Sequence, residues 1–566
     1  MESSTTRRRP PGLVGASRAT LGRDLLAGLS VWAVLVPEAL AYATIAGVNP
    51  VLGLYAAPAA LVLYACTGSS RHLSVGPTAA TAALSAATVA GLVQATSHSF
   101  TEVTIALALT VGLLAIVAAI ARLGFIASFI SQPVLTGFII GLALTIIVGQ
   151  APTLLGLAGS DGNFFVSCWS ILRDLADAQG ATTAVGLGAL TILLVLRRVA
   201  PRWPRAIIVV VLGIAAAWIG DLGEHGVALV GHIPSGLPQV GLPQASWRDY
   251  ASFSGAALGI LLIAFAEGLG AARTFADREH LTIDPNRELL GLGVANVGSA
   301  LCGGIVVGGS LSKTAVNHDS GARSQVSGIA LAGLTLLTLL LLTGLFERLP
   351  EAVLGAIVIA AVVDLVDLRA IRRLARLSTR SLDEIYGLTS RADLIAALAA
   401  LVGVLATDIL PGLGIGIAVS VVLLVWRTSR PHVAVLARLG GPKPRWVDHL
   451  RHPEALRPEG IVVVRPEAGL SFVNADNVRD AIRATIEPDT HAVVLDLETV
   501  GVIDSTAASM LVALDTELAA RGIRLLLARQ IGPVHDLLLT AGAVRLESDV
   551  HATIGDAVRA AQGEGT

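Results

Sequence analysis

The sequence predicts a polytopic α-helical membrane protein that ends in a small soluble α/β domain. Of its 566 residues, 54% are hydrophobic and 14% are charged, and the mean hydropathy is +0.72. Because an ordinary soluble chain carries about 25% charged residues, most of this chain must avoid water. After Arg430 short β-rich runs alternate with amphipathic helical segments, which is typical of an α/β domain. The net charge of −2 gives no sign of nucleic-acid binding.

Apolar runs of about 20 residues divide the first part of the chain into about fourteen membrane spans. Arginines crowd alternate loops if the N-terminus is cytoplasmic, as the positive-inside rule requires. We therefore expect an even number of spans, two cytoplasmic termini, and a multi-pass protein of the plasma membrane that is surrounded by lipid. The expected spans are centred near Val36, Ala59, Ser85, Leu113, Gly141, Leu190, Leu212, Leu262, Val294, Thr314, Thr335, Ile359, Ala399 and Val421.

The same patterns predict the domain boundaries. We expect a cytoplasmic N-terminal segment over 1–23, a transmembrane transport domain over 24–428, a linker rich in Pro, Gly, His and Arg over 429–458, and a cytoplasmic domain over 459–566. Within the last domain we expect strands over 461–464, 492–497 and 523–528, and helices over 475–486, 505–521 and 534–541.

The third and tenth spans each contain an interruption. Residues 73–82 read LSVGPTAATA and residues 305–316 read IVVGGSLSKTAV. Gly-Pro and Gly-Gly break a helix, and a membrane tolerates such a break where it lines a cavity. Matching breaks in two halves of a transporter indicate a substrate site near the bilayer midplane, with half-helix N-termini facing an anion.

Three ionisable side chains lie inside these apolar spans, where each is costly: Glu38, Glu267 and Lys313. Glu38 precedes Val75 by 37 residues, and Glu267 precedes Val307 by 40. Each half therefore offers a carboxylate helix followed two spans later by a broken helix. Because an odd number of spans separates the two copies, we expect inverted repeats.

Together these residues predict an anion site. The half-helix N-termini supply N–H groups and partial positive charge, Thr78, Ser310 and Ser312 can donate hydrogen bonds, and Lys313 adds a full charge. Ionised Glu38 and Glu267 would repel the anion. Since burial disfavours the charged form of a carboxyl, at least one of them is expected to be protonated when the anion is bound, which predicts proton coupling.

The chain resembles the sulfate permease (SulP) family of anion transporters along its whole length. The matching segments are LVPEALAYATIAGVNPVLGLYA, GSSRHLSVGPTAATA, AFAEGLGAARTFA, SLSKTAVN and VIDSTAASM. The resemblance implies seven plus seven helices, divided into a core domain of helices one to four and eight to eleven and a gate domain. It also implies an elevator-like movement of the core, and a homodimer.

The family's pattern assigns site residues. The anion site maps onto Val75, Gly76, Pro77 and Thr78, onto Gly309, Ser310, Leu311 and Ser312, onto Glu38 and Tyr42, and onto the basic position Lys313; the acid of proton-coupled members maps onto Glu267. Ala271 stands where the sodium-dependent bicarbonate branch has a hydroxyl residue, which favours H⁺ over Na⁺. Glu38 stands where many relatives carry Gln, which leaves the substrate charge and the coupling stoichiometry open.

The terminal domain resembles the STAS domains of anti-sigma factor antagonists, in which a hydroxyl of a DS(S/T)G turn is phosphorylated. Here Asp504-Ser505-Thr506 is followed by Ala507, so Ser505 and Thr506 are the candidate phosphorylation site. The alternative is a cap that only begins the helix. The three cysteines lack metal-ligand spacing, and we expect neither a metal nor a cofactor.

We therefore expect a secondary active transporter of small anions, such as sulfate or bicarbonate, that works by H⁺ symport and is not an enzyme. One alternative is a nucleobase-type carrier of the same fold. Lys313 and the terminal domain argue against this alternative. A second alternative is an anion channel or a membrane-bound sensor. The anion transported, symport against exchange, and the dimer interface stay open.

Overall fold

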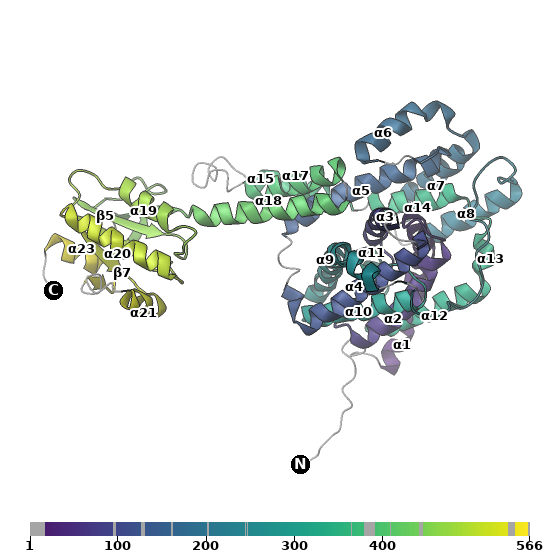
Figure 1. Cartoon of the computed structure of the whole chain (residues 1–566), viewed down its shortest axis with the longest axis horizontal. Coiled ribbons are helices and arrows are strands. Elements are labelled where there is room, and N and C mark those ends of the chain that lie inside the picture. The colour runs from purple at the N-terminus through teal and green to yellow at the C-terminus, as the bar shows by residue number, and fades with distance from the viewer. Residues whose placement is uncertain are drawn as a thin grey trace, which may run out of the picture. The chain divides into compact units, whose positions relative to one another are not determined.

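The computed structural model describes residues 17–93, 98–125, 131–159, 162–200, 203–243, 245, 247–363, 365–377, 391–407, 409–440, 445–541 and 549–563. Most of the expected N-terminal segment 1–23 lies outside these residues. The chain forms two compact units, one comprising Met1–Arg373 and Leu394–Ile417 and the other Leu374–Asp393 and Ala418–Thr566 (Figure 1).

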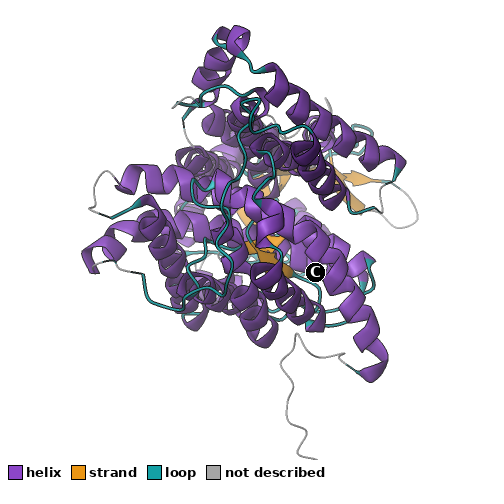
Figure 2. Ribbon diagram, turned by 90° about the vertical axis from the view of Figure 1, so that its right-hand side faces the viewer, coloured by secondary structure: helices purple, strands orange, loops and turns teal. Residues whose placement is uncertain are grey.

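The first unit is a helical bundle, and helices dominate the view in Figure 2. Each of the fourteen predicted span centres lies in a helix of its own. Among the described residues, six helices are long and apolar enough to cross a membrane by themselves, and several others are shorter apolar helices. The fourteen helices are α1 Arg18–Ile45, α2 Val51–Thr67, α3 Ala79–Val93, α4 Phe100–Ile120, α5 Gln132–Leu155, α7 Gly180–Val199, α8 Arg205–Ile219, α9 Trp247–Arg278, α10 Pro285–Leu301, α11 Leu311–Asp319, α12 Val326–Leu341, α14 Glu351–Val363, α17 Ala392–Ala406 and α18 Ile409–Ser429.

Short helices that are not among the predicted spans lie between them: α6 Phe164–Arg173, which is apolar, a 3₁₀ turn at Leu175–Asp177, α13 Thr343–Phe346 and α15 Leu368–Leu377. In α15 the arginines at 369, 372, 373 and 376 recur at helical spacing on one face, with leucine and isoleucine opposite. A segment of this pattern is too polar to be found by a search for apolar runs.

The bundle helices fall into two groups that match the predicted core and gate domains. Helices α1–α4 pack against α9–α12, while α5, α7, α8 and α14 pack on one another. Glycines allow the closest approaches. A Cβ atom on Gly112 of α4 would lie 2.8 Å from the carbonyl oxygen of Gly293 on α10. A Cβ atom on Gly137 of α5 would lie 1.9 Å from the carbonyl oxygen of Ala397 on α17, so a side chain at either position would clash with the neighbouring backbone.

Both predicted interruptions are present, and they meet. Strand β1 (Ser74–Gly76) precedes α3, strand β2 (Gly308–Ser310) precedes α11, and the strands pair antiparallel. In this register Gly76 lies opposite Gly308. Gly76 and Gly308 also occupy equivalent positions in the two halves of the chain when Val75-Gly76 is aligned with Val307-Gly308. Because equivalent residues lie opposite each other, a pseudo-two-fold axis that relates the two halves passes through this pair. That geometry is expected of inverted repeats.

The second unit contains a six-stranded sheet in the order β4-β3-β5-β6-β7-β8, in which β5 to β8 are parallel and β3 is antiparallel to both of its neighbours. Its elements are β3 Val433–Leu439, β4 Arg445–Asp448, β5 Ile461–Pro466, α19 Ala475–Ala484, β6 Ala492–Asp496, α20 Ser505–Ala520, β7 Arg524–Ala528, α21 Gly532–Thr540, β8 Val550–His551 and α23 Ile554–Gln562.

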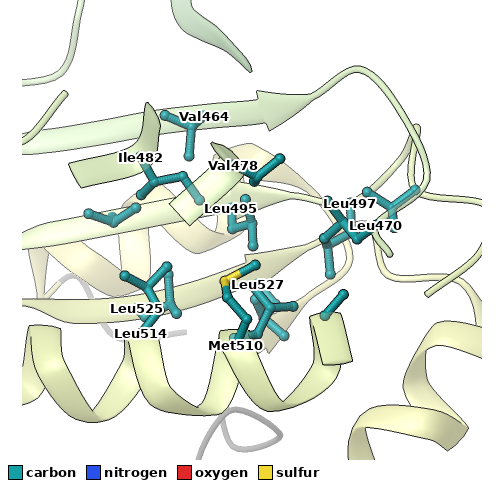
Figure 3. Close-up of a cluster of buried hydrophobic side chains, with 14 of the residues drawn as sticks. Val464, Leu470, Val478, Ile482, Leu495, Leu497, Met510, Leu514, Leu525 and Leu527 are labelled. Atoms are coloured by element: carbon teal, nitrogen blue, oxygen red, sulfur yellow. The ribbon is translucent and has the colours of Figure 1, made fainter. Parts of the chain in front are cut away.

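The pleat of the sheet decides which helices cover each face. Val462, Val464, Val493 and Leu495 lie in one buried cluster with residues of α19, α20 and α21. Figure 3 labels Val464 and Leu495 of this cluster, with Ile482 of α19 and Leu514 of α20. The alternate residues of the same strands form a second cluster with Ile554, Ala557 and Val558 of α23. Both faces are therefore covered, as the period of two along a strand requires for a buried parallel sheet.

All six elements that the sequence predicts over 461–541 are present, with small shifts of their ends. Within 429–458, where the sequence predicts a linker, the structure forms β3 and β4. The alternating burial along β3 explains why Val433–Leu439 joins the sheet, although the flanking Pro, Gly and His residues suggest a loop.

Candidate functional site

Lys313 connects the two halves of the core. From the first turn of α11 its Nζ donates to Oε2 of Glu38 at 3.0 Å and to the carbonyl oxygen of Pro77 at 2.9 Å. The same Nζ lies 5.3 Å from the ring centroid of Tyr42, within the range of a cation–π contact. The lysine is only 1% exposed. Its charge is therefore neutralised by Glu38 on α1. The side chain of Lys313 does not extend to the surface of the bundle.

The two half-helix starts use their hydroxyls as caps. The Thr78 hydroxyl accepts from the backbone N–H of Thr81 at 3.2 Å, and the Ser310 hydroxyl accepts from that of Lys313 at 3.3 Å. These bonds satisfy N–H groups that the first turn of a helix leaves free. In contrast to the buried Lys313, Leu311 is 51% exposed and Ser312 is exposed as well. The accessible face of this site is thus the first turn of α11.

The opposite side of the strand pair is nearly filled. A cavity of about 10 Å³ is lined by Val75, Gly309 and Gly268 among others, which is room for about one water molecule. A Cβ atom on Gly309 would lie 2.6 Å from the Cα of Gly268 on α9. The glycine at 309 is therefore required for the approach of β2 to α9, and the small cavity on that side is too small for an oxyanion.

Glu267 lies one residue before this close approach. It is partly buried, and the charge of Lys313 acts on it. Within the described part of the chain, its carboxylate has no hydrogen bond and no ion pair. Tyr42 lies near both Glu38 and Glu267. The structure thus brings Glu38, Tyr42, Glu267 and Lys313 together around the strand pair, but it pairs only one of the two acids with the lysine.

Several residues that hold the site do not stand out in the sequence. The Asn296 side chain on α10 accepts from the N–H of Val307 at 3.0 Å and donates to the carbonyl oxygen of Val307 at 3.0 Å. The Ser299 hydroxyl donates to the carbonyl oxygen of Ile305 at 2.6 Å. Both side chains are fully buried. They satisfy the unwound backbone before β2, which could not otherwise lie in an apolar interior.

The segment before β1 is held in the same way. Two side chains of the second half do this: Gln325 Nε2 donates to the carbonyl oxygens of Ser70 and Leu73 at 3.0 and 2.8 Å, and Asn317 Nδ2 donates to that of His72 at 2.9 Å. Asn317 lies in α11 and Gln325 directly precedes α12. No local pattern shows which backbone segment either amide binds.

The candidate phosphorylation site lies in the second unit. Asp504 is the N-cap of α20, and its Oδ1 accepts from the N–H of Ala507 at 2.9 Å. Ser505 and Thr506 are exposed in the first helical turn. Their hydroxyls are thus accessible, while the capping role belongs to the aspartate.

Comparisons with known proteins agree with this geometry. The profile of the Sulfate permease family matches residues 21–383, and that of the STAS domain matches residues 452–557. The chain is 36% identical to a probable sulfate transporter of Mycobacterium tuberculosis, with 96% of each chain covered. It is 33% identical to the probable sulfate transporter 4.2 of Arabidopsis thaliana, over 92% of this chain and 78% of the relative.

Solved structures show the same fold. The murine anion transporter Slc26a9 in its inward-facing state superposes with a TM-score of 0.86 at 22% identity, covering 98% of this chain and 94% of the other. The transmembrane domain of the cyanobacterial bicarbonate transporter BicA gives a TM-score of 0.60 at 23% identity, covering 70% of this chain and 98% of the other. At these identities the likeness concerns the fold.

Proposed function

We propose that this chain, which belongs to the sulfate permease family and carries a C-terminal STAS domain, transports a small oxyanion across the plasma membrane together with protons. It is a transporter and not an enzyme. Sulfate is the preferred substrate, because the relatives at 36% and 33% identity are named probable sulfate transporters. Bicarbonate is the next candidate.

The observation that carries the proposal is the distribution of charge at the strand pair. Lys313 and Glu38 form a neutral pair at 3.0 Å, so the lysine has no net charge to offer. The bound anion is then held by the partial positive charge of the half-helix N-termini and by the hydroxyl of Ser312. Glu267 is the acid at this site without a cation bonded to it. An ionised Glu267 would repel the anion, so the anion and a proton bind together.

The core of the proposed carrier moves as one body. Strand β1 belongs to the first repeat and β2 to the second, and their ladder together with the Lys313–Glu38 pair joins the repeats. The gate helices α5, α7, α8 and α14 make most of their contacts with one another. An elevator-like displacement of the core past the gate would leave the anion site intact. We further propose a homodimer with both termini in the cytoplasm.

The test is uptake of radiolabelled sulfate into proteoliposomes under an imposed pH gradient. With the uptake side acidic, the wild-type protein accumulates sulfate, because protonation of Glu267 lowers the repulsion of the anion. Glu267→Gln, which mimics the protonated acid, exchanges sulfate for sulfate but does not accumulate it with the gradient. Glu224→Gln, at an exposed loop position, serves as the matched control.

Unchanged pH-driven accumulation in Glu267→Gln would remove this residue from the coupling role. Downhill flux without accumulation in the wild-type protein would instead favour a channel. Competition by nucleobases, and not by oxyanions, would favour the nucleobase-type carrier.

A further inference from the structure

Helix α15 (Leu368–Leu377) has a basic face without partners in the described chain. At about 100° of rotation per residue, its arginines fall within an arc of about 100° on one side of the helix; they are Arg369, Arg372, Arg373 and Arg376. All four side chains are exposed, and among the described residues none of their guanidinium groups forms a hydrogen bond or an ion pair. Four cations on one short face attract a surface of opposite charge.

The acid nearest to this face in the described chain does not neutralise it. Asp367 precedes the helix, and its Oδ1 accepts from the backbone N–H groups of Arg369 and Ala370 at 2.9 and 3.1 Å. The carboxylate therefore caps the first turn of α15 instead of pairing with a guanidinium group. Residues 365–377 contain four arginines and one aspartate, which leaves a net charge of +3.

The opposite face of α15 is apolar. It comprises Leu368, Ile371, Leu374 and Ala375. Leu368 is 54% exposed, Ala375 is exposed, and Ile371 and Leu374 retain part of their exposed surface. A helix with one basic and one apolar face is typical of the membrane surface, where the apolar face enters the acyl boundary and the cations lie among the headgroups.

The chain keeps α15 close to the membrane. Helix α14, in which the twelfth predicted span is centred, ends at Val363, and α15 begins at Leu368. Five residue steps reach at most about 18 Å. Two turns shorten this link further, because the N–H groups of Leu365 and Val366 donate to the carbonyl oxygens of Val362 and Val363. Since the headgroup layer begins where the apolar part of a span ends, α15 lies within its reach.

We propose that α15 lies in the membrane surface and binds the headgroups of anionic phospholipids. The guanidinium groups donate to the phosphate oxygens, to which arginine can bind with two parallel hydrogen bonds. A zwitterionic headgroup carries the same phosphate, but its quaternary amine cancels the charge, so the anionic lipid is preferred. Because α14 packs on α5 and α7, bound lipid holds the gate helices at the leaflet, a consequence that rests on the proposed elevator movement.

The test is the fluorescence of an environment-sensitive probe on the apolar face of α15. The probe is attached to Ala375→Cys in the full-length protein, in which the native cysteines are replaced by Ser: Cys66, Cys168 and Cys302. In nanodiscs that contain phosphatidylglycerol the emission shifts to the blue relative to nanodiscs of pure phosphatidylcholine, and nitroxide-labelled lipid quenches it more strongly. High salt reverses the shift, because it screens the attraction of exposed charges.

The arginines set the size of this response. Arg372→Gln combined with Arg373→Gln lowers the ratio of surface-bound to free helix about 25-fold, which is about five-fold for each cation. Lysine at the same two positions keeps the charge and lowers the ratio much less. Arg198→Gln is the matched control, because Arg198 on α7 is also exposed and has no partner within the described chain, and it leaves the response unchanged.

The same emission in both bilayers would overturn the proposal, whether the probe is shielded in both or in neither. A double glutamine variant with the parent's unfolding temperature and the parent's response would overturn the role of the arginines. An equal response to soluble glycerol phosphate in phosphatidylcholine nanodiscs would overturn the lipid as the ligand. The measurement requires no transport, so a protein that shows the shift but accumulates no sulfate counts against the proposed function and not against this surface.

Discussion

The buried lysine of an anion carrier could either attract the substrate or hold two helices together, and the pairing of Lys313 with Glu38 favours the second role. A free lysine would attract the substrate directly, whereas a buried pair fixes α1 and α11 in a single arrangement. Desolvation of two charges costs as much as their attraction returns in many proteins. The pair therefore contributes geometry more than affinity, and it leaves the helix N-termini as the source of positive potential.

This interpretation predicts a non-additive double substitution. Lys313→Met leaves an unpaired carboxylate in the core and costs about 3–5 kcal/mol of stability. Glu38→Gln combined with Lys313→Met removes both charges and recovers most of this loss, as the unfolding temperature in detergent would show. Sulfate affinity, measured on the same samples, falls in the single variant. If the effects of the two substitutions on the free energy of unfolding simply add, the Lys313–Glu38 pair does not hold the site together.

The sequence predicts these residues because a charge inside an apolar run is a local signal. It does not predict the pair, because the two residues are separated by 275 positions. Asn296 and Gln325 were not predicted at all, because an uncharged amide does not stand out in the sequence and its role depends on a backbone segment that only folding brings within reach.

At the scale of elements, the strand pair depends on the absence of side chains at its contact with α9. Gly309→Ala places a methyl group 2.6 Å from the Cα of Gly268, which is backbone and cannot move aside as a side chain would. Overpacking of this kind costs about 1–3 kcal/mol. We expect a lower unfolding temperature and loss of sulfate uptake.

Gly270→Ala is the matched control, because a methyl group at that position of α9 would meet no atom within 4 Å. A Gly309→Ala protein as stable and active as the control would show that the contact is not required.

The ends of α9, α11 and the loop before β1 are joined by Glu279. Partial burial raises the pKa of Glu279, but His72, Arg323 and His318 lower it by more, so the pKa lies below its usual value. Because the pKa of Glu279 is lower in the folded state, its ionised carboxylate stabilises the folded protein at pH values above the usual carboxyl range, about pH 4 to 5. This stabilisation is lost as the pH falls through the folded-state pKa.

Glu279→Gln therefore lowers the unfolding temperature at neutral pH, and the difference from the wild-type protein disappears in acid. Thermal unfolding between neutral and acidic pH measures this, with Glu224→Gln as the exposed control. A difference that does not depend on pH would mean that the carboxylate charge is not what stabilises the cluster.

At the scale of the whole molecule, the C-terminal end of α18 is bound by the sheet domain that follows it. Asn474 Nδ2 donates to the carbonyl oxygen of Thr428 at 3.3 Å, and Asn477 Nδ2 donates to that of Ser429 at 2.8 Å. These carbonyls belong to the last turn of the helix, where no intrahelical donor is left. Residues of α18 from Ala418 on belong to the second unit, so these bonds complete the end of the helix within that unit.

Deletion of the residues after Pro431 should lower the yield and the transport rate, and leave the order of anion preference unchanged. All residues proposed for the anion site lie in the first unit, so the truncation does not touch them. A panel of anions competing with labelled sulfate measures the preference. A changed order in the truncated carrier would mean that the STAS domain takes part in selectivity.

Local sequence patterns were enough to predict the membrane class, the fourteen spans, the two breaks and the ionisable residues within them. Each of these features follows from a local pattern, because an apolar run, a glycine break or an isolated charge affects the structure at its own position in the chain. Tertiary structure decided that β1 pairs with β2, that Lys313 is neutralised by Glu38 while Glu267 is not, and that residues 433–439 join a sheet. Those outcomes depend on distances between segments far apart in the chain, which no local pattern contains.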